Sequence, residues 1–145
     1  MFLGEHCHSI DAKGRLIVPA KYRELLGDTF VVTKGLDGCL YIYPNEEWEE
    51  FEQKLNSLPV SKRDARKMVR FFLSSANRVE VDKQGRILVP ASLRAFAELE
   101  KDVVFAGVGK KIEIWSQENW GDTAAFDYDD IDDVVENLSD MGIDF

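Results

Sequence analysis

Residues 11–20, DAKGRLIVPA, recur with small changes as residues 82–91, DKQGRILVPA. Six of the ten positions are identical at an offset of 71 residues, and after one inserted residue the offset becomes 72 as far as Trp48 and Trp120. Self-similarity at a fixed spacing indicates a duplicated structural unit. We therefore expect two copies of one unit of roughly 45 residues.

Each copy has the pattern of strand, tight turn, strand, short helix, strand, turn and strand. In the first copy the turn includes Gly14, because glycine reaches positive φ without a steric penalty, and residues 15–18 form the return strand. Pro19 suits the first position of a helix over residues 19–26, and Gly27 suits the position just past its end. Hairpin strands are expected at 30–33 with 40–43, and at 102–106 with 112–115.

Two helical patterns separate the copies. Apolar residues recur at helical spacing from Trp48 to Leu58 before Pro59 interrupts them. Ser61 and Asp64 resemble a capping box at the start of a second helix. The apolar stripe of that helix comprises Ala65, Met68, Val69, Phe72 and Leu73. The predicted fold is α+β and β-dominated, with a first unit (1–47), a helical hairpin (48–75), a second unit (76–119) and an acidic helical tail (120–145).

The net charge at first argues against a nucleic-acid partner. The chain has 27 acidic and 18 basic residues, which gives a formal charge of -9. Nine of the acids lie in residues 122–145, which hold no lysine or arginine, so residues 1–121 contain 18 acids and 18 bases. The body is therefore neutral, and the total charge says little about any binding face on it.

The acidic tail also carries a helical pattern. Ile131, Val134, Leu138 and Met141 recur at helical spacing, and Gly142 suits the end of a helix. We expect a helix whose acids face solvent. The second possibility is that these acids compete with DNA for basic surfaces or tune oligomerisation.

Several classes of protein are disfavoured. The longest apolar run, residues 103–108, is far shorter than the roughly 20 residues that cross a bilayer. Without a secretory pattern at the N-terminus we expect a cytoplasmic protein whose Cys7 and Cys39 stay as thiols. His6 and His8 flank Cys7, but no second cluster completes a metal site, so no metal or cofactor is expected. The sequence shows no nucleophilic side chain paired with a general base and no phosphate-binding glycine loop, so we do not expect an enzyme.

The repeated turns, 11–15 and 82–86, are the candidate site. Two such small units are best stabilised by pairing with each other, and a pseudo-twofold axis would place both turns symmetrically on one molecule. An aspartate at the start of each turn can accept N–H bonds and hold the arginine four residues later by a charge-assisted bond. Taken alone, a surface ion pair that locks a hairpin is the simpler interpretation.

A family resemblance changes that balance. The doubled turn motif, the IEIW strand at 112–115 and the opening MF-x-G make the sequence similar to the MraZ family, over nearly the whole chain. The units of that family belong to the AbrB/SpoVT superfamily of swapped-hairpin DNA-binding domains. The resemblance implies two tandem swapped-hairpin units that form a pseudo-twofold, β-barrel-like core.

The resemblance also implies a function. It indicates a bacterial transcriptional regulator, associated with the nucleoid, that represses its own operon in the cell-division and cell-wall gene cluster. Its partners would be double-stranded DNA with promoter repeats, and further copies of itself in a ring-like homo-oligomer.

Carried onto this sequence, the resemblance makes Arg15 and Arg86 the leading DNA contacts, assisted by Lys13 and Lys83. Arginine can donate two parallel bonds to phosphate or to guanine, whereas lysine supplies a less directional charge. Gln84 takes the place of Lys13 in the second turn, which we therefore expect to contribute less. Weaker contacts are expected from Arg23 and Arg94, whose stems could instead cover the apolar helices. The turn-positioning residues are Asp11, Gly14, Asp82 and Gly85.

Two alternatives stay open. The basic run at 62–70 could bind DNA, although the glutamates of the preceding helix favour charge pairing across the hairpin or between subunits. The whole chain could also be an interaction module that resembles an antitoxin and does not bind DNA. Such proteins usually carry one unit and a flexible toxin-binding segment, whereas this chain carries two units.

Overall fold

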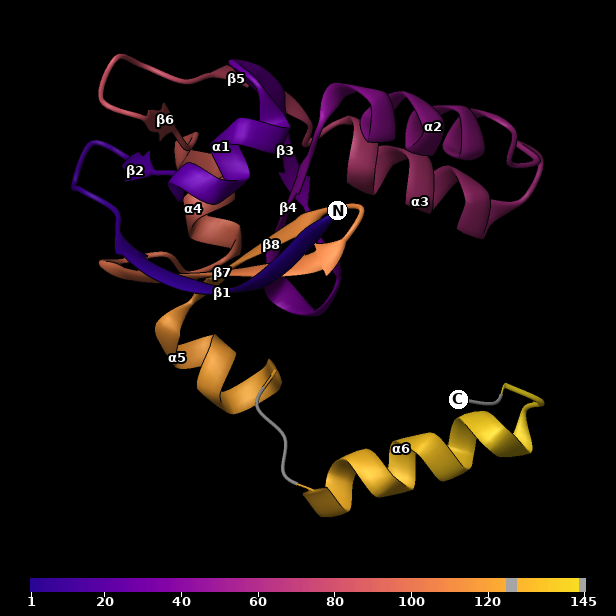
Figure 1. Ribbon diagram of the computed structural model, residues 1–145. Helices are drawn as coiled ribbons and strands as arrows, with labels where there is room; N and C mark the ends of the chain where they lie inside the picture. The colour runs from indigo at the N-terminus through magenta and orange to yellow at the C-terminus, as the bar shows by residue number, and fades with distance from the viewer. Residues whose placement is uncertain (125–127, 144–145) are drawn as a thin grey trace.

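The structure, a computed structural model, describes residues 1–124 and 128–143, without the side chains of residues 128 and 129 (Figure 1). It is a mixed α/β fold with a six-stranded antiparallel sheet and a separate two-stranded sheet, which we call the ribbon. In spatial order the larger sheet contains β1 (Phe2–Ser9), β7 (Asp102–Gly109), β8 (Ile112–Ser116), β4 (Leu40–Tyr43), β3 (Thr29–Lys34) and β5 (Asn77–Glu80). The ribbon pairs β2 (Arg15–Ile17) with β6 (Arg86–Leu88).

The two copies of the repeat interleave. β1 pairs along its length with β7, β4 pairs with β8, β3 pairs with β5, and β2 pairs with β6. The predicted tight turn and return strand are present, since the N–H of Asp11 donates to the Arg15 carbonyl at 3.0 Å. Beyond the turn, the antiparallel pairing of Ile10 with Leu16 is an isolated bridge. The short strand β2 instead takes its partner from the other copy, because the pair buries Leu16 and Ile87 together under the ribbon.

Alternation along the strands divides the core in two. Phe30 and Val32 of β3 face a cluster that also contains the inward residues of the ribbon and of α1 (Ala20–Leu26) and α4 (Ala91–Phe96). Val31 faces the opposite side, where α2 (Asn45–Asn56) and α3 (Arg63–Leu73) cover the sheet. The period of two along a strand therefore sends alternate residues to two different cores. The core expected to be barrel-like lies between the sheet and the ribbon.

The helices are close to the positions that the sequence predicts, with differences at their starts. Pro19 is the residue before α1, with an extended ψ of 135°, and does not occupy its first turn; Gly27 follows the helix as expected. The expected capping box of Ser61 and Asp64 is wrong, because α3 is preceded by Lys62 and no side chain caps its N-terminus. Short helical segments also occur at η1 (Leu36–Gly38), α5 (Gln117–Asn119) and η2 (Trp120–Ala124).

The acidic tail contains the helix α6 (Tyr128–Asp140), as the apolar spacing predicts. Gly142 ends it with a φ of 86°, and the N–H of Ile143 donates to the carbonyl of Leu138. Residues 125–127 and 144–145 of the predicted tail lie outside the described residues. Within the described ranges, no helix has the length and apolarity to cross a membrane.

Candidate nucleic-acid interface

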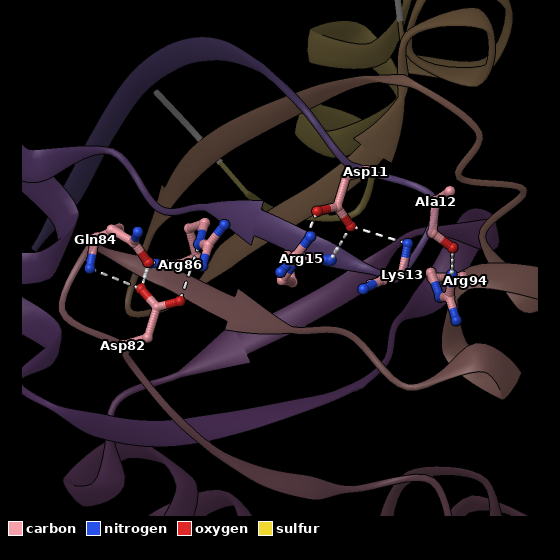
Figure 2. A network of polar contacts seen from close by, with 8 residues as sticks. All are labelled: Asp11, Ala12, Lys13, Arg15, Asp82, Gln84, Arg86 and Arg94. Atoms are coloured by element: carbon pink, nitrogen blue, oxygen red, sulfur yellow. Dashed lines mark hydrogen bonds and ion pairs between the residues drawn. The ribbon is translucent and has the colours of Figure 1, made fainter.

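The ribbon carries one repeated turn at each end, because each turn precedes its own strand and the two strands run antiparallel (Figure 2). Its register sets Arg15 opposite Leu88 and Ile17 opposite Arg86. The central residues of both strands are buried in the core, so the four flanking side chains occupy the outer face. The register is unchanged when the two copies are exchanged, which agrees with the expected pseudo-twofold arrangement.

The first turn is closed by one carboxylate. Oδ1 of Asp11 accepts the backbone N–H groups of Lys13 and Arg15, both at 2.9 Å, and Oδ2 accepts Nε of Arg15 at 2.6 Å. The N–H of Gly14 donates to the Asp11 carbonyl, and Gly14 has a φ of 90°. Within the described residues no hydrogen bond engages the terminal nitrogens of Arg15, whose side chain is 40% exposed. The carboxylate therefore fixes the guanidinium and leaves its outer edge available.

The second turn repeats this geometry and adds one contact. Oδ1 of Asp82 accepts the N–H groups of Gln84 and Arg86 at 2.9 Å, and Oδ2 accepts Nε of Arg86 at 2.9 Å. The side chain of Gln84 also accepts a bond of 2.6 Å from Nη2 of Arg86. Arg86 is accordingly less exposed than Arg15, at 26%. Lys13 and Lys83 are both exposed beside their turns.

The same contacts favour the charged form of both carboxyl groups. The backbone N–H of Arg15 has the largest effect and, with the Arg15 side chain and the Lys13 amide, it lowers the pKa of Asp11. The Arg86 amide, the Arg86 side chain and the Gln84 amide lower the pKa of Asp82 in the same way. Each aspartate is therefore ionised, and its charge is directed at its own turn.

Arg23 and Arg94 lie beneath the turns, each under the turn of the other copy. A Cβ built on Gly85 would lie 2.1 Å from Nη1 of Arg23, and one on Gly14 would lie 2.9 Å from Nε of Arg94. Nη1 of Arg94 donates to the Ala12 carbonyl at 3.3 Å, and the Nε atoms of both arginines are buried without a hydrogen-bond partner in the described structure. The sequence predicts that these arginines contact DNA or cover their own helices. It does not predict that each packs against the turn of the other copy.

The two copies also exchange backbone bonds at these turns. The N–H of Val18 donates to the Gly85 carbonyl at 3.0 Å, and the N–H of Val89 donates to the Gly14 carbonyl at 2.8 Å. Each turn is thus held by the return strand of the other copy. Neither turn can move far without disturbing its counterpart.

The histidines and cysteines that could suggest a metal site lie in packed parts of the fold or on its surface. His6 packs edge-on against Tyr22 and His8 against Phe105, while Cys7 is exposed. Cys39 is buried, and burial raises the pKa of its thiol to about 12. Among the described residues there is no group of three or more His, Cys, Asp or Glu side chains placed to hold a metal.

The helical hairpin carries opposite charges on its two helices. α2 contains five glutamates, and the basic run at 62–70 includes most of α3. No ion pair joins α2 to α3, both of which lie wholly within the described residues. The pairing of these charges across the hairpin or between subunits therefore stays a prediction.

The repeat and the paired turns agree with comparisons to known proteins. A family described as "MraZ protein, putative antitoxin-like" matches residues 1–71 and again 72–137. The chain belongs to the MraZ family. Relatives named as the transcriptional regulator MraZ include those of Lachnoclostridium phytofermentans, 54% identical over all of both chains, and Heliobacterium modesticaldum, 56% identical over 99% of this chain and all of the relative. The MraZ protein of Desulforamulus reducens is 55% identical over 97% of this chain and 99% of its own.

Membership of the MraZ family places the chain among transcriptional regulators and not among enzymes. It confirms the resemblance identified from the two repeated motifs. The sequence reasoning nevertheless missed Ile17 and Leu88, whose side chains share the outer face of the ribbon with the arginines. Side chains alternate between the two faces of a strand, so the neighbours of the buried Leu16 and Ile87 could have been assigned to the outer face.

Proposed function

We propose that this chain is a sequence-specific DNA-binding transcriptional regulator that contacts the major groove with the ribbon and its two turns. The observation that carries the proposal is the pair of arginines on one outer face, each fixed through Nε by an aspartate of its own turn. Fixed guanidinium groups lose little conformational entropy on binding, and their outer edges can donate to phosphate or guanine. A two-stranded ribbon has the width that the major groove admits.

The residues divide into two roles in this proposal. Arg15 and Arg86 contact DNA, with Lys13 and Lys83 adding charge beside them. The turn-positioning residues Asp11, Gly14, Asp82 and Gly85 set the direction of the arginines. Arg23 and Arg94 support the turn of the opposite copy and add positive potential beneath it.

The proposed units are swapped-hairpin domains at 1–47 and 76–119, joined by the helical hairpin 48–75 and followed by the tail 120–145. The four strand pairs that join one copy of the repeat to the other support this division. The protein would act in the cytoplasm on promoter repeats of its own division and cell-wall operon.

We also propose a ring-like homo-oligomer in which the basic face of α3 meets the acidic face of α2 on the next copy. The support is that these faces are complementary in charge and make no ion pair with each other inside the described chain. Several linked copies would gain affinity for spaced repeats through effective concentration. Light scattering tests the assembly: Lys62→Glu with Arg66→Glu should release smaller species, whereas monomers of the unaltered protein would contradict the ring.

DNA binding is tested with the full chain and a pool of random-sequence duplexes. Repeated selection should enrich a common motif, and the affinity for the enriched duplex should fall steeply with salt because phosphate contacts release counterions. Failure to retain any duplex at low salt would overturn the proposed function.

The description of the family as antitoxin-like supports one second candidate, an interaction module that resembles an antitoxin. In that case a pull-down with the full chain returns a small protein in stoichiometric amount, and the duplex selection returns no motif. A common motif without such a partner excludes this candidate.

A further inference from the structure

Two aliphatic side chains stand exposed on the outer face of the ribbon. Ile17 is 42% exposed and Leu88 is 59% exposed, whereas their neighbours Leu16 and Ile87 are buried to 0% and 1%. The hydrophobic core therefore takes one residue from each strand and leaves these two in solvent. A scattered exposed aliphatic residue is ordinary, but these two occupy equivalent positions of the repeat on the proposed binding face.

The ribbon arranges the four outer side chains in a block. Arg15 lies opposite Leu88 and Arg86 lies opposite Ile17, so that each arginine neighbours one aliphatic residue across the strands and another along its own strand. Both arginines are held by their aspartates, which keeps them from covering the aliphatic groups freely. The result is an outer face on which two fixed cations alternate with two apolar groups.

We propose that Ile17 and Leu88 are specificity-determining residues that contact the C5-methyl groups of thymine in the major groove. This inference rests on the proposed DNA-binding function. The thymine methyl is the apolar group that a base pair presents in the major groove, and its recognition requires an aliphatic contact and no hydrogen bond. The fixed arginines favour DNA over a second copy of the ribbon as the occupant, because two such faces would bring like charges together.

The geometry also sets a spacing. Ile17 and Leu88 are diagonal neighbours in the register, and such residues lie about 7–8 Å apart. Successive bases of a strand are about 3.4 Å apart along the helix axis. The two contacted thymines are therefore expected roughly two base pairs apart, one for each copy of the repeat.

The test uses duplexes that the full chain selects from a random-sequence pool. Each thymine is replaced in turn by deoxyuridine, which lacks only the methyl group, and the affinity is measured by fluorescence anisotropy. For the unaltered protein, replacement at two positions should weaken binding about four-fold each, the amount expected for one buried apolar carbon. Ile17→Ala should abolish the response at one position and Leu88→Ala at the other.

The controls separate a local contact from a general defect. Leu36→Ala removes an aliphatic side chain of similar exposure, 52%, on η1, and should leave every methyl response unchanged. Ile17→Val keeps a branched apolar contact and should keep the response, and thermal unfolding of each variant checks the fold.

Each result bears on the inference. The inference is overturned if the selected duplexes contain no thymine, or if deoxyuridine leaves the affinity of the unaltered protein unchanged. It is also overturned if Ile17→Ala and Leu88→Ala respond to deoxyuridine at the same positions and to the same extent. Binding that depends on Arg15 but not on any methyl leaves the proposed function intact and removes this inference alone. A protein that retains no duplex at all fails the proposed function and the inference together.

Discussion

The two turns share one backbone geometry but hold their arginines differently. In the first turn the carboxylate of Asp11 is the side chain that fixes Arg15, and the terminal nitrogens of that arginine have no hydrogen-bond partner in the described residues. In the second turn Gln84 adds a bond to Arg86, which is also less exposed. A duplicated motif can thus keep its fold in both copies while one substitution, lysine to glutamine, changes how firmly the functional side chain is held.

The largest effect is expected where the turns meet the other copy. Gly14→Ala places a Cβ 2.8 Å from the backbone carbonyl of Val89 at a φ of 90°, so both backbone strain and a collision result. Gly85→Ala collides with the end of the Arg23 side chain, which can move away. We expect losses of unfolding free energy of about 2–4 kcal/mol for Gly14→Ala and about 1–2 kcal/mol for Gly85→Ala in urea titrations.

A third glycine calibrates that comparison. Gly38 has a φ of 85°, and no atom lies within 4 Å of the position that a Cβ would take there, so Gly38→Ala measures the strain without a collision. If Gly14→Ala lowers the unfolding free energy no more than Gly38→Ala does, the packing between the copies does not hold the first turn.

The next effect concerns the two aspartates. Asp11→Asn keeps one oxygen for the turn amides but removes the acceptor of Arg15, whereas after Asp82→Asn the arginine still has Gln84. Both variants delete one negative charge, so their difference isolates orientation. We expect Asp11→Asn to weaken binding to the selected duplex about ten-fold and Asp82→Asn about three-fold by anisotropy. Equal losses would contradict the difference between the turns.

A smaller effect tests Gln84 directly. Gln84→Ala alone should change DNA affinity less than about two-fold, because Asp82 still fixes Nε of Arg86. In the Asp82→Asn background the same change should lower affinity further, to the level of Asp11→Asn. Additive behaviour of the two substitutions would show that Gln84 does not substitute for the carboxylate.

The smallest effect near neutral pH concerns ionisation. The pKa values of Asp11 and Asp82 are lowered in the folded protein from 3.8, so the stability that they contribute is fully present above that value. It is lost as the pH falls through the folded pKa values. Urea unfolding should therefore show no contribution from this pair to the pH dependence between pH 7 and pH 5. Below about pH 4, Asp11→Asn with Asp82→Asn should reduce the pH dependence. An unchanged slope there would contradict the assigned contacts.

The sequence predicts local features well where one segment suffices. The repeat, the glycine turns and the helix from Trp48 onward follow from spacing, and the structure confirms them. The partner of β2 and the packing of Arg23 beneath Gly85 join residues about 60–70 positions apart, and no local pattern specifies such contacts. The same limit applies to the charges of α2 and α3, since opposite charges in neighbouring segments of the sequence need not form ion pairs in the fold.

The central claim is that two fixed arginines on one ribbon carry DNA binding. Its most direct test is the salt dependence of affinity for the selected duplex with Arg15→Ala, Arg86→Ala and the double variant, each checked by thermal unfolding. We predict that each single variant loses affinity, Arg15→Ala more than Arg86→Ala, and that the double variant loses the preference for the selected duplex. A folded double variant with unchanged affinity and salt dependence would contradict the claim.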